Sequence, residues 1–150
     1  MILQTWPKDR IFLPTGDGIC VAILDKDAPH DCHLKIALEV LRNVREANEA
    51  ETRVERRFEI RVGLNENTDS VVTDINASRN VAGYGINYAQ RVMSQADGGQ
   101  ILVTSNVFTV LNPREDYRDA FRHFQATAKG NIVLDVYQFN SVDIRPEARE

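Results

Sequence analysis

The chain has 150 residues, of which 43% are hydrophobic, and a formal net charge of -4 at pH 7. This length is typical of one domain, and the hydrophobic share is enough to form a buried core. The lack of a basic block argues against nucleic acid as the main partner, and no apolar run is long enough to span a membrane. The two cysteines, Cys20 and Cys32, suggest a reducing compartment, so we expect a cytoplasmic protein without membrane contact.

The first third of the chain predicts a β-hairpin followed by a helix. Residues 10–14 and 19–24 are predicted strands, and the segment Thr15-Gly16-Asp17-Gly18 between them favours a tight turn. Because residues 19–24 are apolar on both faces, we expect an interior strand there. A helix is predicted from about Asp31, and its charged continuation, residues 45–57, predicts a solvated helix end and loop.

The middle of the chain predicts a half-covered strand, a long loop and a second amphipathic helix. Residues 58–64 alternate between apolar and polar, and the polar segment 65–79 has room for one short strand. Gly98 and Gly99 end the second helix. Its apolar residues fall on one helical face and are Ala82, Ile86, Ala89, Met93 and Ala96.

The last third predicts a covered strand at residues 101–103 and a short helix at 106–111. Two further strands, 121–127 and 132–139, are joined at Lys129-Gly130-Asn131, and a charged tail follows from Val142. This order predicts an α+β fold, with a mostly antiparallel sheet and helices on one face. We expect a single domain over residues 1–150, with its core at about 10–139.

Two groups of polar residues allow either a functional or an ordinary structural interpretation. Asn87 and Arg91 lie four residues apart, so a helix places a neutral amide beside a fixed cation, as many solvated surfaces also do. Asp17 stands at a glycine-flanked turn, where a carboxylate can reach a metal and Gly16 lets a phosphate approach the backbone. An Asp-Gly pair is equally what a tight hairpin favours. Spacing alone leaves both alternatives open.

Five short motifs occur in a fixed order between residues 10 and 139. They are the Thr15–Gly18 turn before an apolar strand, Arg61-Val-Gly-Leu, the segment from Gly83 to Met93, Gly99-Gln-Ile-Leu-Val-Thr, and Lys129-Gly130 before the last strand. This order and spacing resembles the class III nucleotidyl cyclase catalytic domain. Members of that family are adenylate and guanylate cyclases, which convert ATP or GTP into the cyclic monophosphate and pyrophosphate.

The resemblance implies a ferredoxin-like fold, a head-to-tail homodimer and a set of site residues. Asp17 would bind Mg²⁺ or Mn²⁺, with Gly16 beside the phosphates. Asn87 would orient the ribose and Arg91 the phosphates in the transition state, where negative charge develops. Lys129 would contact the triphosphate, and Leu13 and Asn80 would lie at the base. In the family, the metals come from one protomer and the Asn and Arg from the other.

The chain departs from the family pattern at metal and base positions. The family's first strand carries a first metal Asp, and no such strand precedes the hairpin in these 150 residues. Leu13 replaces the usual Lys or Glu, and Asn80 replaces Asp or Cys, so the choice between ATP and GTP is not readable. Residues 65–67 (Asn-Glu-Asn) replace the small residues that usually follow the Arg-x-Gly strand.

From these departures we expect a domain that keeps the cyclase fold without catalysis. It would act as a nucleotide-binding, dimerising or regulatory signalling module. One alternative is the latter part of an active cyclase that uses two metal ions. Another is a structural remnant without a ligand. Because removal of an interior strand leaves backbone groups unpaired, we also expect a partner chain or further sequence to fill that place.

Overall fold

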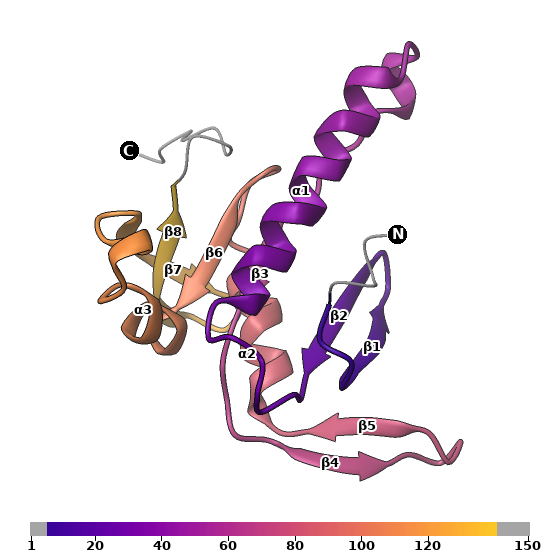
Figure 1. Ribbon diagram of the computed structural model, residues 1–150, viewed down its shortest axis with the longest axis vertical. Helices are drawn as coiled ribbons and strands as arrows, with labels where there is room; N and C mark the ends of the chain where they lie inside the picture. Colours follow the sequence, from indigo (N-terminus) through magenta and orange to yellow (C-terminus); the bar gives the residue numbers. More distant parts are fainter. Residues whose placement is uncertain (1–5, 141–150) are drawn as a thin grey trace.

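The computed structural model describes residues 6–140, and the predicted charged tail from Val142 lies outside them. Within this range, three α-helices are interspersed among eight strands, as Figure 1 shows. The elements are β1 (Arg10–Thr15), β2 (Gly18–Ile23), α1 (Cys32–Ala50), the 3-10 turn η2 (Val54–Arg56), β3 (Val62–Leu64), β4 (Ser70–Thr73), β5 (Arg79–Ala82), α2 (Tyr84–Met93), β6 (Ile101–Thr104), α3 (Ser105–Leu111), η3 (Glu115–Tyr117), β7 (Phe121–Ala128) and β8 (Ile132–Phe139).

The described strands form a central sheet and two separate hairpins. The central sheet has the order β3-β6-β8-β7, while β1–β2 and β4–β5 each form a two-stranded sheet. Only the β3–β6 pair of the described strands is parallel. The predicted α+β class with an antiparallel-rich sheet is therefore confirmed. None of the helices in this part of the chain combines the length and apolar character needed to cross a membrane.

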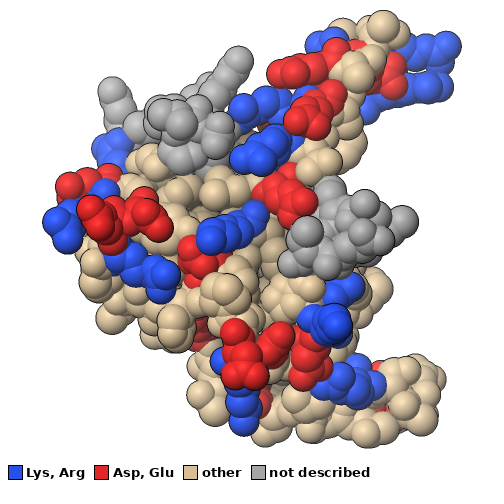
Figure 2. Space-filling model, viewed as in Figure 1, with Lys and Arg blue, Asp and Glu red and all other residues tan. Residues whose placement is uncertain are grey.

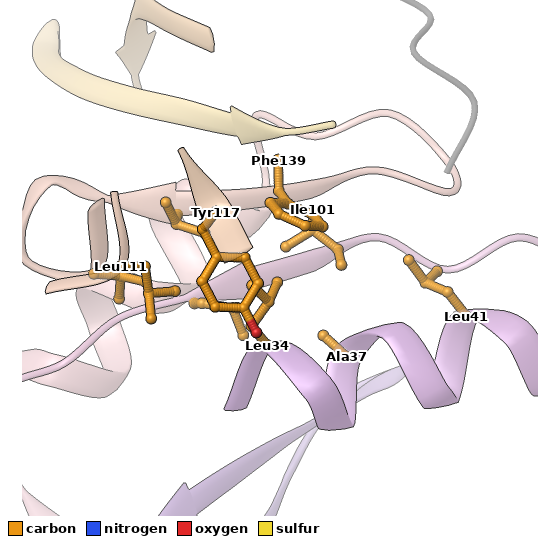
Figure 3. Close-up of a cluster of buried hydrophobic side chains, with 10 residues drawn as sticks. Leu34, Ala37, Leu41, Ile101, Leu111, Tyr117 and Phe139 are labelled. Atoms are coloured by element: carbon orange, nitrogen blue, oxygen red, sulfur yellow. The ribbon is translucent and has the colours of Figure 1, made fainter. Parts of the chain in front are cut away.

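Helices cover both faces of the central sheet, not one face as predicted. Alternate residues of β6 point to opposite sides, so Ile101 and Val103 join one cluster and Leu102 joins another. The first cluster, here the α1 core, packs α1 and α3 against the sheet (Figure 3). The second, here the α2 core, contains Val92 and Ala96 at the end of α2 and just beyond it. Its buried residues are Val92, Ala96, Leu102, Ala128, Leu134 and Val136.

Three predicted elements differ in extent from those observed. The strand predicted at 58–64 is shortened to Val62–Leu64, because β6 begins at Ile101 and pairs with only these three residues. The loop predicted at 65–79 contains β4 and leads into β5, and the two strands pair as a hairpin. Ala82, predicted on the helix face, lies in β5, so α2 begins two residues later at Tyr84.

Strand β2 is not the interior strand that its apolar sequence predicts. Within residues 6–140 it pairs with β1 alone, and Ile19 is 61% exposed. Strand β3 likewise lies at the end of the central sheet. One edge of each strand therefore has no hydrogen-bonded neighbour among the described residues. The expectation that a partner or further sequence fills this place stays a prediction.

A buried hydrogen bond ties the start of α1 to η3. The Tyr117 hydroxyl donates to Asp31 Oδ2 at 2.6 Å, and Lys35 Nζ lies 3.3 Å from the same oxygen. Figure 3 shows the Tyr117 ring over the start of α1, beside Leu34. Burial raises the pKa of Asp31, but the hydrogen bonds from Tyr117 and Lys35 outweigh it and hold that pKa below its ordinary value.

We expect Tyr117→Phe to lower the free energy of unfolding by about 1–3 kcal/mol, because it leaves a buried carboxylate without its main partner. Urea denaturation at pH 7 measures this change. The matched control is Tyr137→Phe, since the Tyr137 ring stacks on Phe108 and its hydroxyl has no hydrogen bond within residues 6–140. Because the pKa of Asp31 is lowered in the folded state, its contribution is present above its unfolded pKa and is lost in acid. Equal stability of the two variants at pH 7 would contradict this role.

Candidate functional site

Helix α2 carries Asn87 and Arg91, and a glycine lets it lie directly on the sheet. A Cβ at Gly63 would come within 2.5 Å of the Ala89 carbonyl oxygen and 2.6 Å of the Met93 nitrogen. Both neighbours are backbone atoms of the helix, so no side-chain movement relieves the contact. Gly63 therefore sets the distance between α2 and β3.

The start of α2 is fixed by a carboxylate from the loop before β4. Asp69 Oδ2 accepts a hydrogen bond from Gly85 N at 2.9 Å, and Asn67 Nδ2 donates to Asp69 Oδ1 at 2.6 Å. A Cβ at Gly83 or Gly85 would overlap the Asp69 carboxylate. The Gly83-x-Gly85 pair therefore makes room for Asp69, which satisfies a free N–H and the positive end of the helix dipole.

The neighbouring loop is held by its own polar side chains. Asn65 Nδ2 donates to the Gly85 carbonyl at 3.1 Å, and Thr104 Oγ1 donates to Asn65 Oδ1 at 2.9 Å. Asn106 Nδ2 donates to the Glu66 carbonyl at 3.0 Å. The residues that replace the family's small side chains thus join β6, α3 and the start of α2.

Asn87 and Arg91 both reach solvent from α2. Asn87 is exposed and Arg91 is half-buried. Neither side chain makes a hydrogen bond or ion pair with another residue of the described range. The predicted pairing of an amide with a cation on one helix is confirmed in its placement, and both groups are available to a ligand or a second chain.

Asp17, Gly16 and Leu13 lie on the β1–β2 hairpin. Gly16 has φ of +75° and Asp17 completes a two-residue turn, with Thr15 paired to Gly18. This agrees with the predicted turn, and a glycine there adopts positive φ without strain. Asp17 is exposed, and Leu13 is half-buried within β1.

Asn80 and Lys129 lie on two other hairpins. Asn80 is half-buried in β5, and its Oδ1 accepts a hydrogen bond from Val81 N at 2.7 Å. Lys129 is exposed in the turn between β7 and β8, where Gly130 and Asn131 have φ of +84° and +58°. The predicted Lys129-Gly130-Asn131 turn is therefore confirmed.

The chain brings some of these residues to neighbouring elements and keeps others apart. Strand β1, with Leu13, lies against β5, with Asn80, and Arg79 Nη2 contacts Asp9 Oδ1 at 3.0 Å between the two hairpins. The β1–β2 hairpin has no extensive contact with α2 (Figure 1). Two surface hollows of about 460 and 390 Å³ contain none of the predicted site residues. Neither of these two hollows therefore gathers Asp17, Asn87 and Arg91.

The metal part of the predicted site is sparse. Residues 6–140 contain no group of three or more His, Cys, Asp or Glu side chains that could hold a metal ion. Two-metal catalysis needs carboxylates that bridge ions about 3.5–4 Å apart. Asp17 at an exposed turn does not by itself meet that requirement. The described residues of a single chain therefore do not fit a two-ion centre.

Sequence comparison decides the family. The sequence profile described as the adenylate and guanylate cyclase catalytic domain matches residues 15–141. The chain belongs to this family. The match to the cyclase domain includes every predicted site residue except Leu13, which lies two residues before it. No curated protein matches this chain in sequence at a significant level.

Solved structures of cyclases share the fold of this cyclase domain. The guanylate cyclase domain of RhGC from Catenaria anguillulae, in complex with GTP, is 21% identical with a TM-score of 0.64, over 93% of this chain and 76% of that one. An adenylate/guanylate cyclase/hydrolase from Silicibacter pomeroyi is 20% identical with a TM-score of 0.64, over 89% and 74%. The guanylyl cyclase Cya2 is 20% identical with a TM-score of 0.65, over 87% and 69%.

Sequence patterns did not reveal the residues that hold the site in place. Asp69 lies 16 residues before its partner Gly85, and Thr104 lies 39 residues after Asn65. The signal that was present is the Gly83-x-Gly85 pair, which is too short for a phosphate-binding motif and is explained by the space that Asp69 needs.

We expect Asp69→Ala to lower the free energy of unfolding by about 0.5–2 kcal/mol, because it removes the group that caps α2. Urea denaturation monitored by circular dichroism measures the loss. Asp27→Ala is the matched control, since Asp27 is exposed and its side chain has no partner within the described residues. If both substitutions have the same effect, Asp69 does not stabilise the helix.

Proposed function

We propose that this cyclase domain binds ATP or GTP between two copies of the chain and acts as a nucleotide-binding regulatory module in cytoplasmic signalling. Asn87 and Arg91 of one copy would face Asp17 of the other, and Lys129 would contact the triphosphate. The carrying observation is that Asn87 and Arg91 reach solvent without partners among residues 6–140. A nucleotide and a second chain would supply the missing contacts.

The two hairpins favour self-association. Half of the exposed large hydrophobic residues of the described range lie on them, and Ile75 at the β4–β5 tip is fully exposed. Figure 1 shows that the β4–β5 hairpin projects beside β1–β2 and away from the central sheet. Exposed apolar surface of this kind marks interaction sites. The residues are Phe12, Ile19, Val71, Val72 and Ile75.

Figure 2 shows acidic and basic side chains interspersed over the face in view, without a broad basic surface there. Triphosphate binding would depend on Arg91 of α2 and Lys129 of the turn between β7 and β8. Arginine is suited to phosphate because its guanidinium is always charged and donates to two oxygens at once.

An active cyclase is the alternative. The family match supports it, and relatives include a rhodopsin-guanylyl cyclase core crystallised with ATPalphaS and a guanylate cyclase domain crystallised with GTP. The metal ligands available within residues 6–140 argue against an active cyclase, because Asp17 alone does not fit a two-ion centre. The described residues therefore support nucleotide binding without turnover.

We expect the purified chain to bind ATP or GTP in Mg²⁺ or Mn²⁺ without forming cyclic nucleotide. Arg91→Ala should weaken binding about 10- to 150-fold, because a hydrogen bond to a charged group contributes about 1.5–3 kcal/mol. Lys129→Ala should also weaken nucleotide binding. Calorimetric titration measures nucleotide affinity, and chromatographic product analysis measures the formation of cyclic nucleotide. Arg118→Ala is the control, since Arg118 is exposed and lies on neither proposed element.

Turnover that disappears in both Asp17→Ala and Arg91→Ala would establish the active cyclase instead. Absence of any nucleotide binding would overturn the proposed function and leave the structural remnant as the explanation.

We expect the chain to dimerise at micromolar concentration and Ile75→Asp to shift it towards monomer, because a charge at a fully exposed apolar tip opposes burial in an interface. Sedimentation velocity measures the populations. Val54→Asp is the matched control, since Val54 is an exposed apolar residue on η2, outside both hairpins. A folded wild-type monomer at tens of micromolar would contradict the dimer.

A further inference from the structure

Helix α2 carries an exposed aromatic residue in line with Asn87 and Arg91. Tyr84 is the first residue of α2, three before Asn87 and seven before Arg91. Seven residues rise about 10.5 Å along a helix and return to within about 20° of the same direction. The three side chains therefore form one stripe, with Tyr84 at one end, Asn87 between and Arg91 at the other.

All four tyrosines lie within residues 6–140, and Tyr84 is the one among them with no packing or hydrogen-bond partner in that range. It is 69% exposed and has no ring contact or hydrogen bond within residues 6–140. The Tyr117 hydroxyl binds Asp31, and the Tyr137 ring stacks on Phe108. Tyr88 packs against the α2 core. Nothing in the fold of the described residues needs an aromatic ring at position 84.

The two ends of the stripe carry opposite charges, which would orient a bound ligand along α2. The Asp69 carboxylate lies at the start of α2, bound to Gly85 N, and occupies the place that a phosphate would otherwise take at a helix N-terminus. At the other end, Arg91 supplies a fixed cation. An elongated ligand with a neutral end and an anionic end would therefore lie with its neutral end over Tyr84.

The two positions expected to read the edge of the base offer one kind of polar group between them. Leu13 has no polar side-chain atom, and the Oδ1 of Asn80 already accepts a hydrogen bond from Val81 N, which leaves its Nδ2 donors. The face of the base remains, and an aromatic side chain recognises a base face whatever its edge groups are.

We propose that Tyr84 is the base platform of the nucleotide site. The purine of ATP or GTP stacks on the Tyr84 ring, and the ribose and phosphates follow α2 towards Asn87 and Arg91. This inference rests on the proposed function, since it assigns the orientation of the nucleotide in that same site. Because stacking does not distinguish adenine from guanine, the site holds ATP and GTP with similar affinity.

Calorimetric titration of the full chain with ATP, GTP and inorganic tripolyphosphate tests the platform. Tyr84→Ala should weaken ATP and GTP binding about 5- to 150-fold each, which corresponds to loss of one base–aromatic stack. It should leave tripolyphosphate binding unchanged, because that probe has no base. Tyr84→Phe keeps the ring and should restore most of the affinity. Phe58→Ala, which removes an exposed aromatic residue after η2, is the matched control.

The inference fails if Tyr84→Ala binds ATP as the wild type does while Arg91→Ala does not, an outcome that leaves the proposed function intact. It also fails if Tyr84→Ala weakens tripolyphosphate as much as ATP, which would show a general disturbance of α2. A wild-type chain that binds no nucleotide overturns both this inference and the proposed function.

Discussion

The contact of α2 with β3 at Gly63 is the constraint on which the candidate site depends. A Cβ at position 63 would collide with the backbone of α2, so only glycine lets the helix lie this close to β3. The Asp69 hydrogen bond then fixes where the helix begins. Together they determine the direction in which Asn87 and Arg91 point. A site that takes its second half from another chain needs such rigidity, since neither half can adjust to the other without cost.

Local signals in the sequence predicted most of the hairpins and helices, and long-range contacts account for what was missed. The turns at Gly16-Asp17 and Lys129-Gly130-Asn131 were predictable, because their backbone conformation requires these residue types. The length of β3 was not, because it depends on where β6 begins. The packing of helices on both faces was missed. A continuous apolar run such as 101–103 predicts that both faces are covered but does not predict which helix covers each face.

The placement of the candidate residues was predictable from the sequence, and the contacts that support them were not. Asn87 and Arg91 were proposed from their spacing and the family pattern, the helix places both at the surface, and their role stays a prediction. The carboxylate that fixes this helix comes from a polar loop where many residues could have served, so no pattern singles out Asp69. The same loop shows that Asn65 is compatible with an ordered conformation, because Thr104 and Gly85 complete its hydrogen bonds.

One edge of β2 has no strand neighbour among residues 6–140, and this has a consequence for how the domain behaves in solution. Exposed strand edges are usually protected by a lysine, a proline or another charged residue. Strand β1 contains Arg10 and Pro14, but β2 is Gly-Ile-Cys-Val-Ala-Ile and contains none of these. Its backbone groups that have no strand partner among residues 6–140 lie beside apolar side chains, the combination that templates intermolecular strand pairing. A strand that pairs with that edge would therefore also protect the domain from aggregation. The solubility of the domain then indicates whether the edge is covered.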